Sequence, residues 1–146
     1  MTSQPSSRPS GPPEDSARPG SSEPAGQHGL TVEVSLPRSE VAVVVIEGEL
    51  NADTAAALRD RLTEQLHLGR RYLILDLTGV PFMDSSGLNT VMRAQQETRR
   101  VRGSLRLAAP APAVSRLIEL TGVAMTVPVH GSVDEALAEH RRQVDG

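Results

Sequence analysis

The sequence predicts a single α/β domain with a mixed, mostly parallel sheet of about five strands covered by about four helices. From residue 41 onward, short apolar runs rich in β-branched residues alternate with stretches of helical period. Such alternation indicates parallel strands joined by helices. Before residue 41, an alternating apolar and polar run precedes a turn, which adds one antiparallel strand through a hairpin.

Five segments are expected to form strands: 30–36, 41–46, 72–77, 105–108 and 125–129. The second is an almost continuous run of Val, Ala and Ile, which is typical of a strand buried on both faces. Pro128 lies in the last segment, and proline is confined largely to sheet edges. We therefore expect the segment 125–129 to form an edge strand.

Four helices are expected: from Asn51 or Asp53 to about 68, 86–101, 112–120, and from Ser132 to the C-terminus. Asn51 or Asp53 can cap the first helix, and Ser132 with Glu135 fits a capping box for the last. The following apolar side chains are expected to face the sheet: Leu58, Leu62, Leu66, Leu88, Val91, Met92, Ala136, Leu137 and Val144.

Composition limits the possible functions. Residues 1–29 are rich in Pro, Gly and Ser and are expected to form a disordered tail before the domain at 30–146. The net charge is −3, with one Tyr, one Phe and no Trp, so a nucleic-acid partner has little support. Cysteine is absent, which excludes a disulfide or a cysteine-based metal site. No apolar run reaches the roughly 20 residues of a membrane span. We expect a cytoplasmic protein without a membrane partner, metal or cofactor.

The segment from Tyr72 to Leu88 is the most informative part of the chain. It consists of an apolar strand, a loop with Gly79 and Pro81, and a helix start at Asp-Ser-Ser-Gly. Two serines therefore lie at a helix N-terminus, where unpaired N–H groups and the helix dipole favour an anion such as a phosphate. Ordinary helix capping by Asp and Ser explains the same pattern, and both interpretations stay open at this point.

The same residues resemble a known family. Leu75-Asp-Leu-Thr-Gly-Val-Pro-Phe-Met-Asp-Ser-Ser-Gly-Leu88 closely resembles the signature of bacterial anti-sigma factor antagonists, the STAS-domain family. Three more segments match that family in order: 46–55 with Gly-Glu-Leu-Asn-Ala-Asp-Thr-Ala, 108–123 with Pro112 and Gly122, and 132–137. The resemblance covers about residues 30 to 142.

The resemblance implies a function without catalysis. Family members bind an anti-sigma factor that is also a serine kinase, and binding releases a sigma factor. The kinase then phosphorylates a serine at the start of the second helix, which ends the interaction, and a metal-dependent serine phosphatase removes the phosphate. By residue match the acceptor is Ser86, with Ser85 as the alternative.

Further residues are expected to contact the partner by the same match: Asp84, Ser85, Gly87, Met83, Asn89, Arg93, Asn51 and Asp53. Gly87 could let the kinase approach closely, or could serve turn geometry. Phe82 and Met83 could form an apolar contact patch or anchor the loop to the core, and for Phe82 we favour the core. Asn89 and Arg93 could equally form a solvated helix face. Asn51 replaces the Asp usual in the family, so it removes a negative charge that Asp53 could restore.

Three other functions compete with this one. A STAS scaffold or transport-complex subunit that is never phosphorylated is the main alternative. An enzyme that uses Ser86 as a nucleophile would need a nearby base, and neither His67 nor His130 is placed close to it by the sequence. A nucleotide-binding module lacks both a P-loop and a G-x-G-x-x-G pattern.

Overall fold

The computed structural model describes residues 29–145, so the expected tail lies outside the described residues except for Gly29. One five-stranded sheet has the strand order β2-β3-β4-β5-β6. The strands are β2 (Thr31–Arg38), β3 (Val41–Glu47), β4 (Tyr72–Gly79), β5 (Ser104–Ala108) and β6 (Val129–His130). Among the described strands, β2 and β3 pair in antiparallel orientation and the other neighbours are parallel. The predicted mixed, mostly parallel sheet is confirmed.

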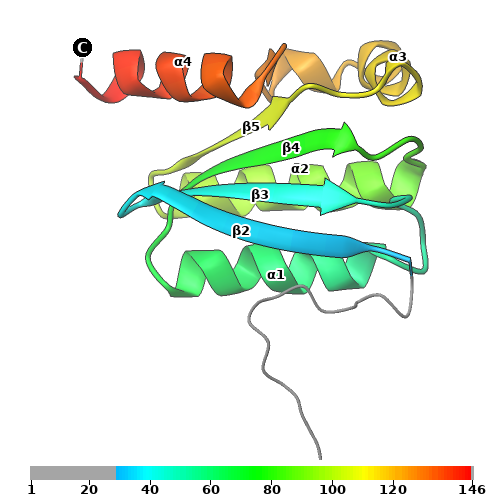
Figure 1. The fold of residues 1–146 in the computed structure, drawn as a ribbon, viewed down its shortest axis with the longest axis horizontal. Coiled ribbons are helices and arrows are strands. Elements are labelled where there is room, and N and C mark those ends of the chain that lie inside the picture. Colours follow the sequence, from blue (N-terminus) through cyan, green and yellow to red (C-terminus); the bar gives the residue numbers. More distant parts are fainter. Residues whose placement is uncertain (1–28, 146) are drawn as a thin grey trace, which may run out of the picture.

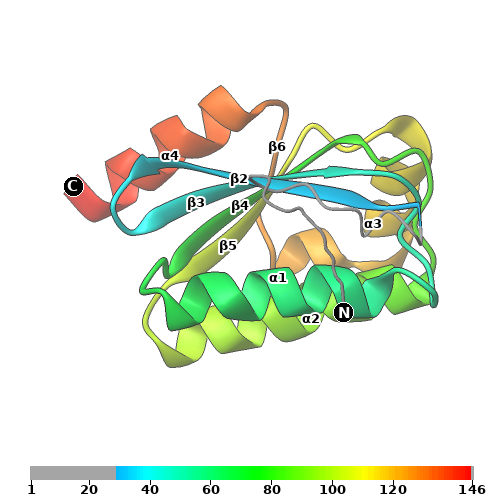
Figure 2. The same cartoon turned by 60° about the horizontal axis from the view of Figure 1, so that its bottom comes forward.

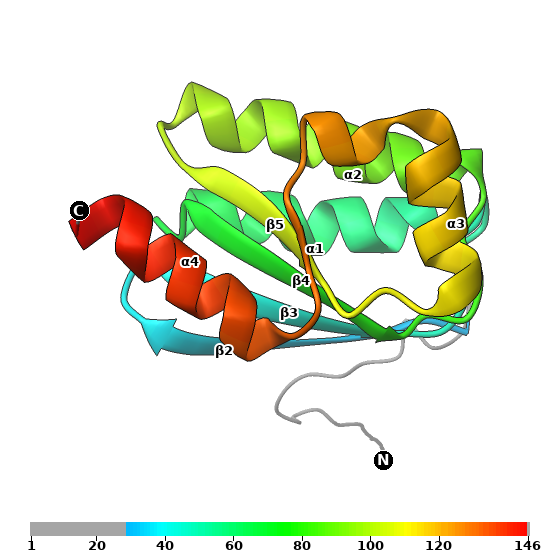
Figure 3. The same ribbon diagram turned by 90° about the horizontal axis from the view of Figure 1, so that it is seen from above.

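Helices cover both faces of this sheet. They are α1 (Ala55–His67), α2 (Ser85–Arg100), α3 (Pro112–Thr121) and α4 (Val133–Asp145), with a short 3₁₀ helix η4 (Val123–Met125) after α3. The helices α1 and α2 lie side by side against one face, and α4 crosses the other face (Figure 1, Figure 2). Seen from above, the segment containing β6 runs between η4 and α4 along the edge of the sheet (Figure 3).

The hydrophobic core consists of two clusters, one on each face of the sheet. On strand β3, Ala42, Val44 and Ile46 join the larger cluster with α1 and α2. Val41 and Val43 face the opposite way, into a smaller cluster that includes Ala136 of α4. Burial on both faces explains why residues 41–46 are a continuous apolar run, since side chains of a strand alternate between its two faces.

Two expectations about the last part of the chain are wrong. The segment 125–129 is not a full strand, because Val123–Met125 form η4 and only Val129 and His130 pair with β5. This short strand does lie at the sheet edge, as Pro128 indicated. Val144 was expected to face the sheet but is 46% exposed, because it lies near the end of α4 where the helix has passed beyond the core. Ala136 is buried, as expected.

The helix caps follow the sequence in part. Ser132 Oγ accepts a hydrogen bond from the Glu135 N–H (3.0 Å), so the predicted cap of α4 is confirmed. The Glu135 carboxylate accepts from the Gly131 N–H (3.0 Å), which completes a variant of the capping box. Neither Asn51 nor Asp53 is the N-cap of α1, because that helix begins at Ala55 with Thr54 in the cap position.

Candidate functional site

Hydrogen bonds join the loop after β3 to the loop after β4. The Gly48 N–H donates to the Gly79 carbonyl, and the Leu50 N–H donates to the Phe82 carbonyl, both at 3.0 Å. The Asp84 N–H returns a bond to the Leu50 carbonyl, also at 3.0 Å. Because β3 and β4 are parallel, both loops leave the sheet at the same edge, and these bonds continue the strand pairing past its end. The two loops form one surface, which we call the joined loops (residues 48–54 and 80–84).

The Asn51 side chain shapes the first of the joined loops. Its Oδ1 atom accepts hydrogen bonds from the N–H groups of Asp53 (2.9 Å) and Thr54 (3.2 Å). The Thr54 hydroxyl in turn accepts from the Asn51 N–H (3.0 Å) and donates to the Glu49 carbonyl (2.8 Å). The amide oxygen of Asn51 is therefore engaged within the loop, whereas Asp53 is exposed and presents its carboxylate to solvent.

Asp84 caps the helix that carries the two serines. Its Oδ1 atom accepts hydrogen bonds from the N–H groups of Ser86 (2.8 Å) and Gly87 (3.3 Å). These N–H groups were expected to stabilise a phosphate on a serine, but a carboxylate already occupies them. A phosphate on this turn would therefore lie beside the negative charge of Asp84 rather than on free N–H donors.

The two serines differ in exposure. Ser85 is exposed and Ser86 is half-buried. Residues four apart on a helix share a face, and Ser85 lies in line with the exposed Asn89 and Arg93. Ser86 lies in line with Thr90, which is only 6% exposed and whose hydroxyl donates to the Ser86 carbonyl (3.1 Å). The solvent face of α2 at this end therefore carries Ser85, Asn89 and Arg93.

Two expectations about the residues around the serines need correction. Phe82 was favoured as a core residue but is 47% exposed. Met83 is 4% exposed and belongs to the larger core cluster, so it does not present an apolar patch. Met83 forms a β-bridge with Leu50, and successive side chains of an extended segment point in opposite directions. Met83 therefore points into the core and Phe82 points outward.

Gly87 is buried, and neither expected role fits its position. Its φ angle is not positive, so turn geometry does not require glycine here. A Cβ atom at this position would lie 2.8 Å from Met83 Cγ, 2.9 Å from Leu50 Cβ and 3.1 Å from the Leu50 carbonyl oxygen. The missing side chain therefore allows α2 to pack against the joined loops, and it does not open a path for a partner.

The joined loops and the strand ends beside them are acidic. Glu47 and Glu49 flank Gly48 and are exposed, as is Asp53, and Asp84 is half-buried. Glu47 and Glu49 were not among the residues expected to contact a partner, although their position around the glycine that follows a strand was a usable signal. This surface therefore combines negative charge with the exposed ring of Phe82, and a docking partner has to complement both.

The described histidines lie on other elements than the two serines of α2. His67 is the last residue of α1, and the ring of His140 lies 4.5 Å from that of Tyr72. His130 Nε2 lies 3.2 Å from Nη1 of Arg106. Burial and the Arg106 charge both lower the pKa of His130. Within residues 29–145, no group of three or more His, Asp or Glu side chains is placed to hold a metal ion.

These features define a STAS domain, and the comparisons with known proteins agree. The STAS domain family model matches residues 35–136, and the chain belongs to that family. No helix in the described part of the chain is both long and apolar enough to cross a membrane.

Three similar proteins are named as antagonists of anti-sigma factors. The candidate anti-sigma factor antagonist BtrV of Bordetella bronchiseptica is 30% identical over 96 residues, which cover 66% of this chain and 83% of BtrV. The anti-sigma F factor antagonist of Paenibacillus polymyxa is 27% identical over 100 residues, covering 68% of this chain and 86% of that protein. The crystal structure of an anti-sigma factor antagonist from Mycobacterium paratuberculosis superimposes with a TM-score of 0.71 at 30% identity, covering 78% of this chain and 96% of that one.

Proposed function

We propose that this protein is an anti-sigma factor antagonist that binds an anti-sigma factor with serine kinase activity, and that phosphorylation of a serine on α2 ends the interaction. The observation that carries the proposal is the exposed Ser85 at the first turn of α2, beside the exposed Phe82 and the joined loops. We call the docking surface the serine surface and define it by its exposed residues: Asp53, Phe82, Ser85, Asn89 and Arg93. Binding in the cytoplasm would release the sigma factor.

Exposure favours Ser85 over Ser86 as the phosphoacceptor. A kinase must bring the serine hydroxyl in line with the γ-phosphate of ATP, so the acceptor has to enter the partner's active site. Ser85 lies on the solvent face of α2 with Asn89 and Arg93, whereas Ser86 lies above the buried Thr90. We therefore propose Ser85 as the first candidate and keep Ser86, which the sequence match favoured, as the alternative.

The switch would act through local electrostatics at the contact surface. Phosphorylation adds about −1.5 to −2 charges. Since the Asp84 carboxylate already holds the Ser86 and Gly87 N–H groups, the fold offers the new charge little compensation. In the complex the phosphoserine would also meet the carboxylates and nucleotide phosphates of the kinase site. A penalty of about 3 kcal/mol would weaken binding roughly a hundredfold without refolding the domain.

A metal-dependent serine phosphatase would reverse the modification. Because Ser85 is exposed at the start of a helix, the phosphoserine would be accessible without local unfolding. The main alternative is a STAS scaffold or transport-complex subunit whose serines are never modified, and the experiment below separates the two.

The test measures binding of the full chain to the anti-sigma kinases of the same cell, followed by ATP addition and mass spectrometry. We expect tight binding by the unmodified protein and by Ser85→Ala, and a loss of roughly a hundredfold for Ser85→Asp. Ser86→Ala is the matched control, because it removes the neighbouring hydroxyl and leaves the exposed one. One phosphate on Ser85 in the wild type and in Ser86→Ala would support the proposal.

Two results would correct or overturn the proposal. A phosphate that persists in Ser85→Ala and disappears in Ser86→Ala would move the acceptor to Ser86 and keep the mechanism. Absence of binding and of phosphate with every kinase of this class would refute the switch and favour the unmodified scaffold.

A further inference from the structure

A groove opens along the unpaired part of β5, at the opposite end of the sheet from the serine surface. β6 pairs only with Leu107 and Ala108, so within the described part of the chain the first three residues of β5 have no strand beside them on that edge. Before β6 the chain contacts α2, where Gln95 donates to the Thr126 carbonyl (2.8 Å). The groove has a volume of about 220 Å³. Its lining residues are Gln95, Arg99, Gly103, Ser104, Leu105, Arg106, Thr126, Pro128 and Gln143.

Arg106 places a buried positive charge against this groove. Its side chain is only 3% exposed. Nη2 donates to Gln143 Oε1 (2.6 Å) and Nη1 to His130 Nε2 (3.2 Å), so both contacts are with neutral acceptors. Nε is buried and makes no hydrogen bond within the described part of the chain. Burial of a guanidinium is costly unless it is paired, and removal from water lowers the pKa of Arg106.

No carboxylate pairs directly with Arg106 among residues 29–145, where the ion pairs involve other arginines. Glu139 acts on Arg106 only at longer range, and its own carboxylate contacts Arg142 at 2.7 Å. Glu40 lies near the groove's end of the sheet but contacts Arg71 at 3.4 Å. The buried guanidinium therefore has unmatched charge that a bound anion could neutralise.

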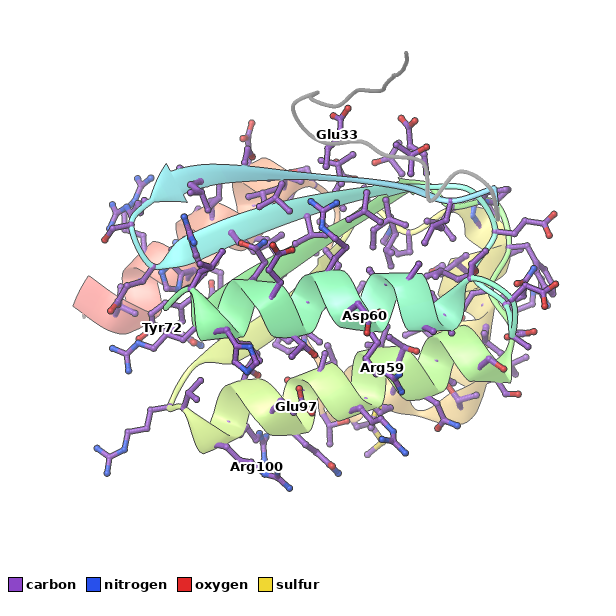
Figure 4. All side chains as sticks on the ribbon, turned by 90° about the horizontal axis from the view of Figure 1, so that it is seen from below. Glu33, Arg59, Asp60, Tyr72, Glu97 and Arg100 are labelled. Carbon is purple, nitrogen blue, oxygen red and sulfur yellow. The ribbon has the colours of Figure 1, made fainter. Side chains whose placement is uncertain are left out.

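The loops at this end of the sheet are also basic. The segment after α1 carries Arg70 and Arg71, and the end of α2 carries Arg99, Arg100 and Arg102. Arg99 lines the groove, whereas Arg100 points away from the sheet on the outer face of α2, near Glu97 (Figure 4). Clustered charge of one sign attracts ions of the opposite sign into a cleft.

We propose that this groove binds a small oxyanion, a carboxylate or a phosphate, with Arg106 as the buried charge partner and Arg99 at the entrance. The volume suits a small ion better than a drug-sized molecule, for which pockets of about 300–1,000 Å³ are usual. Ser104, Gln95 and Gln143 supply further polar groups along the walls. The length of α2 separates this groove from Ser85, so the proposal does not depend on the phosphorylation switch.

The test is a titration of the isotope-labelled full chain with inorganic phosphate and, separately, with succinate, followed by NMR at constant ionic strength. We expect saturable shifts of the amide signals of Gln95, Ser104 and Gln143. The phosphate and succinate arms show which oxyanion the groove prefers. Arg99→Gln should weaken binding about threefold or more, whereas Arg100→Gln should change it less than twofold, because only Arg99 borders the groove.

A second variant tests the buried charge. Arg106→Gln should abolish saturable binding if it folds, and if it does not fold the comparison of Arg99→Gln with Arg100→Gln decides alone. Absence of saturation with both ions would overturn the proposal. Equal weakening by Arg99→Gln and Arg100→Gln would also overturn it, since it would show only nonspecific attraction to a basic surface.

Discussion

Replacement of Gly87 by alanine tests the packing that joins α2 to the loops. The added Cβ would lie 2.8–3.1 Å from Met83 Cγ, Leu50 Cβ and the Leu50 carbonyl oxygen, all below ordinary contact distance. Met83 can shift, but the Leu50 carbonyl accepts the Asp84 N–H and is fixed by that bond. Overpacking of a dense interior costs about 1–3 kcal/mol.

The helix propensity of alanine offsets part of this cost. Alanine is favoured over glycine by up to about 1 kcal/mol in a helix interior, and less in the first turn. We therefore expect Gly87→Ala to lower the free energy of unfolding by about 1 kcal/mol, or the melting temperature by roughly 4 °C for a domain of this size. Amide exchange at Leu50 and Asp84 should become faster, because their bonds join the two loops.

The assay is urea denaturation followed by circular dichroism, with native-state hydrogen exchange read by NMR. Asn89→Ala is the control, since it adds helix propensity two residues away at an exposed position and should change stability by less than about 0.5 kcal/mol. If Gly87→Ala is as stable as the wild type and exchange at Leu50 and Asp84 is unchanged, the packing argument is wrong.

Three further predictions concern single side chains. Asp84→Ala should lower the free energy of unfolding by about 1 kcal/mol through loss of the cap on α2, whereas Asp84→Asn should retain most of it, which thermal denaturation would show. Phe82→Ala should leave the melting temperature nearly unchanged, because the ring is 47% exposed, but should weaken partner binding measured by calorimetry; a large loss of stability would contradict its exposure. His130 accepts from Arg106 and must be neutral to do so, and its lowered pKa means that the unfolded chain binds the proton first. Stability should therefore fall as the pH drops below about 6.5, and His130→Gln should flatten this dependence in pH-resolved melting curves.

Local patterns in the sequence were sufficient for most of the fold. The β-branched run at 41–46 and the leucines of α1 reflect burial against one sheet, and periodicity reports burial directly. The strand expected at 125–129 was wrong because an apolar run with a proline does not distinguish a strand from a 3₁₀ turn. Val144 was misplaced because α4 extends beyond the end of the core, so a residue with the spacing of the buried face is exposed there.

The candidate site was only partly accessible to sequence reasoning. The Asp-Ser-Ser-Gly motif located the start of α2, and Asp84 is its cap. The burial of Met83 and Gly87 and the exposure of Phe82 depend on Leu50, more than thirty residues earlier in the chain. No local pattern carries that information, because the contact forms only when β3 and β4 pair.

Residue patterns are enough to assign the fold class, the family and the position of the two serines, because burial leaves a local period in each element and the family segments occur in order along the chain. Which serine faces solvent and which N–H groups the cap occupies depend on the tertiary structure. So does the burial of Arg106 beside a groove, where no carboxylate among residues 29–145 pairs with it. These properties depend on segments that meet through strand pairing and helix packing, so they follow from the assembled sheet rather than from any one stretch of residues.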